Sequence, residues 1–362
     1  MGDFGFLPKV WNHSIKMEVK IAKWPPLLLT AAMYYSANFL IFGSRRSYPA
    51  APIKNNLDWV NVMCYDYHGS WDTSKTGAHA ALFDPNTNLS SIYGLKSWLS
   101  AGVPGNKLVM GLPLYGKTWK LKDPNVHGVG AAAIGVGPRN AGVLLYSQVV
   151  EFNKRNNATV AYDLDTASVY SYKGTTWVGY DDPLTTTMKI GFAQALELRG
   201  YFFWALSYDY ESTVSAQEIL SGEHYLSLTN KFDIEVCSHP HYCILLVLHC
   251  YCASVKAAAP VVKAGYYPSW ALDNFPPSAI DTTLLFHIIY AFLVPNNVTF
   301  KFDISNSTAS ILSNFTTTLH RKTPHVKAPY SIRGGGVEPD PFAAMATNAS
   351  SRGVLFIRET SM

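Results

Sequence analysis

The strongest constraint on the fold is a set of short apolar runs that alternate along the chain with helix-like stretches. Four runs lie in the first part of the chain, beginning at Leu27, Asp58, Lys107 and Gly200. Their apolar residues are nearly continuous rather than alternating, which is typical of strands buried on both faces. Helix-like stretches, such as 92–101 and 188–198, lie between them. This rhythm predicts a parallel α/β fold, and both a barrel and a doubly wound sheet satisfy it.

Two further parts of the chain have a different pattern. Between residues 119 and 181, glycine-rich turns and short tyrosine-containing segments predict an inserted α+β subdomain with a helix at 146–154. After an unpatterned linker, a second set of strand candidates begins at Lys263, Phe286 and Val326, and a further helix is expected to begin near Phe356.

Composition and charge narrow the choice of partner. The 362 residues are 48% hydrophobic and 15% charged, which is globular composition with enough apolar mass for one large core or two modest ones. The net charge is only +4 and no basic run occurs, so the electrostatic footprint of a nucleic-acid-binding protein is missing. We therefore expect a partner that is uncharged or weakly charged.

Signals of the secretory pathway are present but unusually placed. Seven Asn-x-Ser/Thr sequons suggest a glycoprotein, at Asn12, Asn88, Asn157, Asn297, Asn306, Asn314 and Asn348. The amino terminus has no charged region followed by an apolar run, so no signal peptide is expected there. A signal-like stretch lies instead at residues 243–259, and it is too short to span a bilayer comfortably. An internal export signal favours the fusion of two neighbouring reading frames.

The region around this stretch is rich in cysteine and histidine, which raises the possibility of a zinc site. The side chains concerned are Cys237, His239, His241, Cys243, His249, Cys250 and Cys252. We do not favour zinc, because no paired C-x-x-C spacing occurs and the neighbouring residues are apolar rather than turn-forming. Cys64 lies in a strand-like run. No disulfide framework, metal site or cofactor is therefore expected.

Motifs in the first set of runs connect the chain to a known family. The run at Asp58 continues into Met63-x-Tyr65-Asp66, GLPLYGKTW follows from Gly111, and YFFWAL from Tyr201. These motifs resemble strands six, seven and eight of the plant class V chitinases of glycoside hydrolase family 18, and LLLTAAMYYS from Leu27 resembles strand five. The resemblance covers about residues 25–217, including that family's insertion between strands seven and eight. The resemblance implies a (β/α)8 TIM barrel that hydrolyses β-1,4-linked polymers of N-acetylglucosamine.

The last part of the chain resembles strands one to three of the same family, through GYYPSW, HIIYAFL and SIRGGGVEPDPF. We therefore expect an incomplete TIM barrel with an inserted α+β subdomain and strands in shuffled order. The run at Lys263 should dock beside the run at Gly200, and the closure gap should lie between family strands three and five. The implied division of the chain is 1–24 unassigned, 25–221 the second half of a barrel with its insertion at about 119–181, 222–262 a linker, and 263–362 the first part of a second barrel.

The catalytic segment of the family is missing from the sequence. Members carry Asp-x-x-Asp-x-Asp-x-Glu on strand four, and its Glu protonates the glycosidic oxygen while the substrate's acetamido group attacks the anomeric carbon. Asp163-x-Asp165 continues without a Glu, and Asp233 and Glu235 lie in the linker, so we interpret these as solvated loop carboxylates. Arg333 also stands where the family has a glycine in the third-strand turn. No catalytic acid is expected, and hydrolysis should be negligible.

The resemblance still implies a sugar-binding site. Tyr65 would hydrogen-bond the acetamido group, Asp66 would hold polar groups of the sugar ring, and Trp204 would support the ring with its flat face. The other implied substrate-binding residues are Met63, Trp71, Tyr115, Tyr266 and Phe292. Met63 is expected mainly to pack, and the last two contribute only if the two halves assemble.

Three hypotheses about function remain open. The chain is a chitinase-family hydrolase, a noncatalytic lectin-like binding protein, or a fused reading frame without a folded product, because a barrel short of one strand leaves two unpaired edges. For the first two, the expected partner is chitin or N-acetylglucosamine oligosaccharides, with no nucleic acid and no stable membrane span. The expected location is extracellular or in the secretory pathway. The oligosaccharide length and the oligomeric state are left open.

Overall fold

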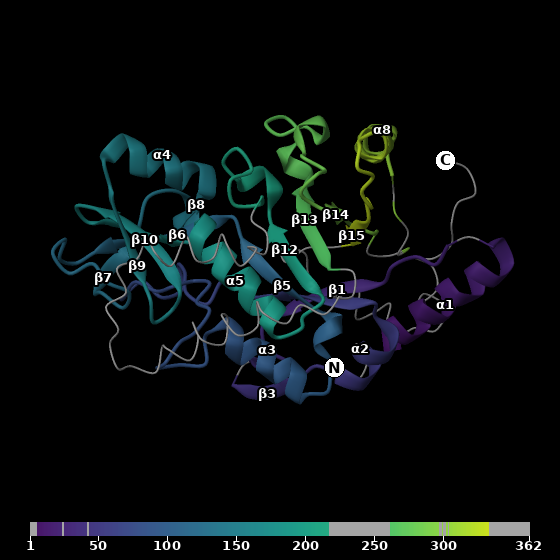
Figure 1. Cartoon of the computed structure of the whole chain (residues 1–362), viewed down its shortest axis with the longest axis horizontal. Coiled ribbons are helices and arrows are strands. Elements are labelled where there is room, and N and C mark those ends of the chain that lie inside the picture. The colour runs from purple at the N-terminus through teal and green to yellow at the C-terminus, as the bar shows by residue number, and fades with distance from the viewer. Residues whose placement is uncertain are drawn as a thin grey trace.

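The computed structural model describes residues 6–23, 25–41, 43–216, 261–296, 299, 302 and 304–332. Two sheets organise these residues: a curled parallel sheet of seven strands, and an antiparallel sheet of six strands beside it (Figure 1). Residues 222–260 of the predicted linker, with its cysteines, histidines and signal-like stretch, lie outside the described residues, as do Arg333 and the helix expected near Phe356. The last residue of the predicted linker, Val262, begins a strand instead.

The parallel sheet has the strand order β1-β4-β5-β12-β13-β14-β15. Its strands are β1 (Thr30–Tyr34), β4 (Trp59–Met63), β5 (Leu108–Pro113), β12 (Gly200–Trp204), β13 (Val262–Pro268), β14 (His287–Leu293) and β15 (Tyr330–Ile332). Every neighbouring pair is parallel. The connections contain the helices α2 (Ala50–Asn56), α3 (Ser91–Ser100), α5 (Pro183–Ala195) and α8 (Asn306–His320). The predicted incomplete barrel is confirmed, and its strands occur in shuffled order.

The two parts of the chain meet where β12 pairs with β13. The register runs from Gly200 opposite Val262 to Phe203 opposite Gly265. Gly200 is required here because its φ is +151° and an added Cβ would lie 1.9 Å from the carbonyl oxygen of Val262. The docking of the Lys263 run beside the Gly200 run is therefore confirmed. In the described part of the chain, β1 and β15 are the two ends of the sheet.

The inserted α+β subdomain lies between β5 and α5, and the prediction of such an insertion is confirmed. Its strands are β6 (Tyr115–Leu121), β7 (Ala133–Val136), β8 (Val143–Leu145), β9 (Thr159–Asp163), β10 (Ser168–Lys173) and β11 (Thr176–Tyr180), with α4 (Tyr146–Asn156) before β9. The indole rings of Trp119 and Trp177 pack edge to face at 5.4 Å on this sheet. Because β6 follows β5 after one residue, the inserted sheet is held close to the barrel.

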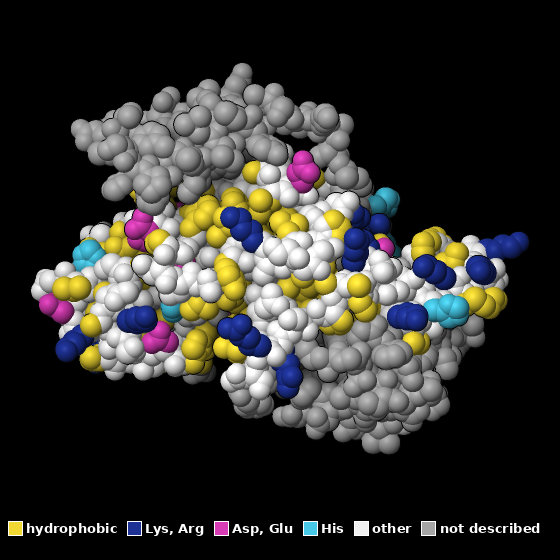
Figure 2. All heavy atoms as spheres, turned by 90° about the horizontal axis from the view of Figure 1, so that it is seen from below, with side chains coloured by type: hydrophobic (Ala, Val, Ile, Leu, Met, Phe, Trp, Pro, Cys, Tyr) yellow, Lys and Arg dark blue, Asp and Glu magenta, His cyan; other side chains and the backbone are white. Residues whose placement is uncertain are grey.

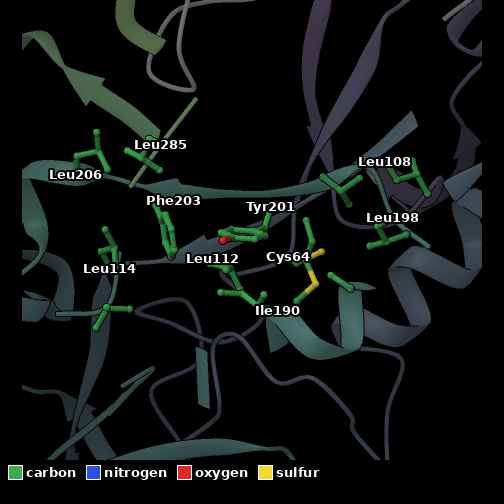
Figure 3. Packing of buried hydrophobic residues seen from close by; sticks show 14 of the residues in the cluster. Cys64, Leu108, Leu112, Leu114, Ile190, Leu198, Tyr201, Phe203, Leu206 and Leu285 are labelled. Carbon is green, nitrogen blue, oxygen red and sulfur yellow. The ribbon is translucent and has the colours of Figure 1, made fainter. Parts of the chain in front are cut away.

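The barrel strands bury both faces. Tyr201 and Phe203 on β12 pack outward with Leu112 of β5 and Ile190 of α5 (Figure 3), whereas Phe202 packs inward with Trp59 and Tyr266. Successive strand residues point to opposite faces, so a strand between an inner core and a layer of helices must be apolar at nearly every position. This packing explains the continuous apolar runs of the sequence.

The remaining elements are short or peripheral. Residues of the unassigned amino-terminal part form α1 (Phe6–Ala22), which contacts α2, and β2 (Asn38–Ile41) pairs with β3 (Ser44–Ser47). Single 3-10 turns occur at 105–107, 140–142, 206–208, 269–271 and 277–279. On the face drawn in Figure 2, lysine and arginine side chains lie in several separate places. In the part of the chain that the structure describes, we find no helix with the length and apolar character needed to cross a membrane.

Candidate functional site

A row of aromatic and polar side chains lies at the carboxyl ends of the barrel strands. These ends meet at one mouth of a parallel barrel, where barrel enzymes carry their chemistry. Tyr65 and Asp66 follow β4, and Tyr115 begins β6 just beyond β5. Trp204 ends β12, Tyr266 lies near the end of β13, and Phe292 near the end of β14. The predicted residues therefore come from five neighbouring segments of the fold.

The Asp66 carboxylate is the polar centre of this row. Its Oδ1 accepts a hydrogen bond of 2.8 Å from the Tyr115 hydroxyl and forms an ion pair of 2.9 Å with Nζ of Lys117. The side chain remains 43% exposed, and the backbone has a φ of +61°, in the left-handed region that Asp tolerates better than most residues. Both contacts use the same oxygen. Among the described residues no hydrogen bond engages Oδ2, so this oxygen can accept one from a ligand.

Two tyrosines beside Asp66 remain neutral phenols. Burial, followed by the nearby Tyr266 and Asp66, raises the pKa of Tyr65 well above its usual value. Burial and the Asp66 charge do the same to the pKa of Tyr115. The Tyr115 hydroxyl donates a hydrogen bond to Asp66, whereas the Tyr65 hydroxyl has no hydrogen-bond partner within the described ranges. Tyr65 is thus the member of the pair that can donate to an incoming ligand.

Sequence reasoning missed two residues of this centre, Lys117 and His79. Lys117 is 9% exposed, and its Nζ lies 5.3 Å from the Tyr115 ring centroid and 5.4 Å from that of Trp71. The one available signal for Lys117 was its position two residues after Tyr115, which places both side chains on one face of β6. His79 comes from the loop after β4, and no periodic pattern marks it.

The imidazole of His79 contacts the Tyr115 backbone and lies near Asp66. Its Nε2 lies 3.0 Å from the Tyr115 carbonyl oxygen and therefore donates to it, and its Nδ1 lies 4.0 Å from Oδ1 of Asp66. Burial lowers the pKa of His79 to about 3, so the ring is neutral at neutral pH. Lys117 is consequently the cation that balances Asp66.

A second group of rings is built from both parts of the chain. The indole of Trp204 stacks on Phe292 with centroids 5.7 Å apart and lies 5.1 Å from Tyr266. Trp270, which is 56% exposed, extends the row at 6.3 Å from Phe292. The Tyr266 hydroxyl accepts a hydrogen bond of 2.9 Å from Asn61 on β4. The halves thus assemble at this end of the barrel.

Phe202 joins the two groups, because its ring lies 6.3 Å from Tyr65 and 5.4 Å from Tyr266. Trp71 is 63% exposed, and its ring contacts Lys117 of the row. Met63 is half-buried at the end of β4. Asp163 lies in the inserted sheet, where its Oδ2 accepts a hydrogen bond of 3.1 Å from the Thr166 backbone. Asp233 and Glu235 lie outside the described residues.

Metal ligation finds no support in the described ranges, where no group of three or more His, Cys, Asp and Glu side chains could hold an ion. Cys64, the free cysteine of those ranges, is buried, and burial raises its thiol pKa to about 12. The chemistry that the row offers is therefore hydrogen bonding by Tyr65 and Asp66 beside flat aromatic faces. Such a combination suits sugar rings, which present apolar faces and polar edges.

The chain is similar to several known proteins. A family model described as glycosyl hydrolases family 18 matches residues 11–209. A class V chitinase of Medicago truncatula is 54% identical over 209 residues, which are 58% of this chain and 55% of that protein. A family 18 chitinase from Cycas revoluta, solved in complex with (GlcNAc)3, has a TM-score of 0.55 and 40% identity, covering 58% of this chain and 60% of its own.

A chitinase-like agglutinin from Robinia pseudoacacia is also similar, with a TM-score of 0.53 and 35% identity over 58% of this chain and 60% of its own. The chain therefore resembles both hydrolases and an agglutinin built on one fold. It spans about half the length of the curated relatives that it matches.

Proposed function

The chain belongs to glycosyl hydrolase family 18, and on that premise we propose that it binds oligosaccharides of β-1,4-linked N-acetylglucosamine with negligible hydrolysis. The observation that carries this proposal is the Asp66 carboxylate, held at Oδ1 by Tyr115 and Lys117 beside the Tyr65 hydroxyl and the Trp204 stack. The (GlcNAc)3 complex of the Cycas chitinase supports the choice of ligand.

Each contact matches one part of an N-acetylglucosamine residue. The Tyr65 hydroxyl would donate to the acetamido carbonyl, and Oδ2 of Asp66 would accept from the acetamido N–H or a ring hydroxyl. The face of Trp204 would pack against the apolar face of the sugar. Stacking and a few hydrogen bonds must overcome the cost of immobilising the ligand. In the described part of the chain the sheet is open between β1 and β15, and an open barrel excludes water poorly. We therefore expect weak binding.

Hydrolysis requires a proton donor for the leaving oxygen. Oδ1 of Asp66 accepts a hydrogen bond from Tyr115 and pairs with Lys117, so this oxygen is already engaged as an acceptor. The contribution of a general acid is about two to four orders of magnitude. The second candidate, chitin hydrolysis, is favoured by the 54% identity to a class V chitinase. Binding without turnover is favoured by the likeness to the agglutinin and by the missing strand-four motif.

We also propose that the protein is a secreted glycoprotein. Asn88 and Asn157 are exposed and could carry glycans. Asn12 is a poorer acceptor, because its Nδ2 donates to the Asn56 carbonyl at 2.8 Å within the contact of α1 with α2.

Tryptophan fluorescence tests the binding proposal. Titration of the full chain with (GlcNAc)4 should give weak, saturable quenching, because Trp204 lies in the site. Trp204→Ala should remove most of this response, and Tyr65→Phe should weaken binding through loss of the acetamido hydrogen bond. Tyr93→Phe, a matched loss of a hydroxyl at an exposed position of α3, should leave binding unchanged.

Three results would contradict the proposal. Equal binding of cellulose oligosaccharides, which lack the acetamido group, would show that Tyr65 and Asp66 do not recognise it. Tight binding that survives Trp204→Ala would place the ligand elsewhere. Release of reducing ends from (GlcNAc)4 at a rate typical of chitinases would favour the hydrolase hypothesis.

A further inference from the structure

The opposite, amino-terminal end of the barrel strands gathers basic side chains around one tryptophan. Arg199 directly precedes β12 and His287 is the first residue of β14. The Lys327 backbone bonds to both neighbours of His287, donating to the Phe286 carbonyl at 2.9 Å and accepting from the Ile288 N–H at 2.8 Å. These three residues therefore come from both parts of the chain.

His287 is buried without satisfying its polar atoms. The residue is 8% exposed, and neither ring nitrogen has a hydrogen-bond partner among the residues that the structure describes. The imidazole meets the Trp59 ring edge to face at 5.2 Å. Burial, with the charges of Lys327 and Arg199, lowers the pKa of His287 to about 4, so the ring is neutral and has one N–H donor. An unpaired buried donor is costly, and native proteins rarely leave one.

Arg199 also has an unsatisfied buried nitrogen, and its side chain lies beside the same Trp59 ring. Its guanidinium carbon lies 5.5 Å from the Trp59 ring centroid, and its buried Nε has no hydrogen-bond partner in the described part of the chain. Its Nη1 reaches only the Asn106 carbonyl, at 3.4 Å. Within the described ranges, no carboxylate forms an ion pair with Arg199 or with the exposed Lys327. Asp58 is the carboxylate whose charge affects the neighbouring Lys107. Asp58 accepts a hydrogen bond of 2.7 Å from the Leu29 N–H.

We propose that Arg199, His287 and Lys327 form a binding site for a tetrahedral oxyanion such as phosphate or sulfate. The oxygens would accept from Nε of Arg199 and from the His287 ring, and Lys327 would supply charge at the exposed rim. Arg is well suited to such ligands because its donors form a rigid planar fork. The site lies at the other end of the strands from the Tyr65–Trp204 row and is independent of the proposed sugar binding.

Oxyanion binding would also connect the two parts of the chain. Arg199 belongs to the part that ends with β12, whereas His287 and Lys327 belong to the part that contains β13 and β14. A ligand that binds only when these strands are assembled stabilises the assembled state by RT ln(1 + [L]/Kd), where [L] is the free ligand concentration. The melting temperature should therefore rise with phosphate concentration.

Calorimetric titration of the full chain with inorganic phosphate, and separately with sulfate, tests this site at constant ionic strength maintained with chloride. We expect saturable binding of one anion. Arg199→Met should weaken binding about tenfold or more, and Lys327→Ala several-fold. Lys122→Ala, which removes an exposed lysine of the inserted sheet, should have no effect. Quenching by (GlcNAc)4 should not change in Lys327→Ala.

A second readout protects the test against a variant that does not fold. In the unmodified protein, the ring signals of His287, assigned by comparison with His287→Gln, should shift on addition of phosphate and not of chloride. The proposal is overturned if phosphate and sulfate give no saturable response, or if chloride stabilises the protein equally. It is also overturned if binding survives both Arg199→Met and Lys327→Ala.

Discussion

Lys189→Met should destabilise the protein strongly, because Lys189 belongs to a buried ion pair. Lys189 and Asp181 are each 1% exposed, and Nζ lies 2.5 Å from both carboxylate oxygens. Nζ also donates to the Ala80 carbonyl at 2.6 Å, which ties α5 to the loop that carries His79. Methionine keeps much of the apolar volume but removes the charge and all three hydrogen bonds. Removing one partner of a buried pair costs about 3–5 kcal/mol, so we expect a loss in this range.

Urea unfolding, followed by tryptophan fluorescence and circular dichroism, measures this loss. Lys122→Met, at an exposed lysine, should change the free energy of unfolding by less than about 0.5 kcal/mol. The double variant Lys189→Met/Asp181→Leu should recover much of the stability, since no unpaired charge then remains buried. A loss below about 1 kcal/mol in the single variant, or a double variant as unstable as the single one, would refute the reasoning.

The pH dependence of the same variant gives an independent check. Burial raises the pKa of Asp181, although Lys189 opposes this effect. Without Lys189, the folded state should bind a proton at Asp181 more readily than the unfolded chain does. Stability that depends on such a raised pKa is present at low pH and is lost as the pH rises. Lys189→Met should therefore be less destabilising at pH 5 than at pH 8.

Two further changes test the junction of the halves and the support of Asp66. In urea unfolding, Gly200→Ala should lower the free energy of unfolding by at least about 3 kcal/mol, because the new Cβ would meet the Val262 carbonyl at 1.9 Å. Gly128→Ala, where the new Cβ meets open space, should be nearly neutral. Similar losses in the two variants would mean that the β12–β13 contact is not as tight as described. His79 stays neutral to about pH 3 when folded, so the unfolded chain binds the extra proton and stability should fall on acidification below pH 6.5. His79→Asn should reduce this slope between about pH 6 and 4 by roughly 1.4 kcal/mol per pH unit, and identical slopes would contradict the assignment of His79 as buried and neutral.

The strands of the barrel could be predicted from the sequence because burial on both faces leaves a local record. Each residue of β12 from Tyr201 to Phe203 is buried, so the run is apolar whichever face a side chain meets. The order of strands followed from the motifs around Asp66 and Gly265, which identified two known segments of one barrel. The sheet then placed β13 beside β12, as the barrel geometry requires.

The supporting contacts of the site could not be predicted in the same way. Lys117 acts on Asp66 from a different strand, and His79 reaches Tyr115 from a loop. The Arg199–His287 contact with Trp59 depends on three strands and on both parts of the chain. Such contacts depend on how separate elements pack, and a single sequence contains no periodicity that reports them. The eight predicted sugar-binding residues remain a prediction until a ligand is observed.

The pairing of β12 with β13 bears on how tolerant a barrel is of the order in which its strands are synthesised. The first and last strands of a closed barrel are neighbours in space. A chain whose strands run from β1 through β12 into β13 therefore keeps the neighbour contacts of an ordinary barrel, except those between the two ends of the sheet at β1 and β15. The long connection from β12 to β13 adds little entropic cost, since each doubling of loop length costs only about 0.6 kcal/mol. The connecting loop therefore makes the position of the break in strand order a small term in stability.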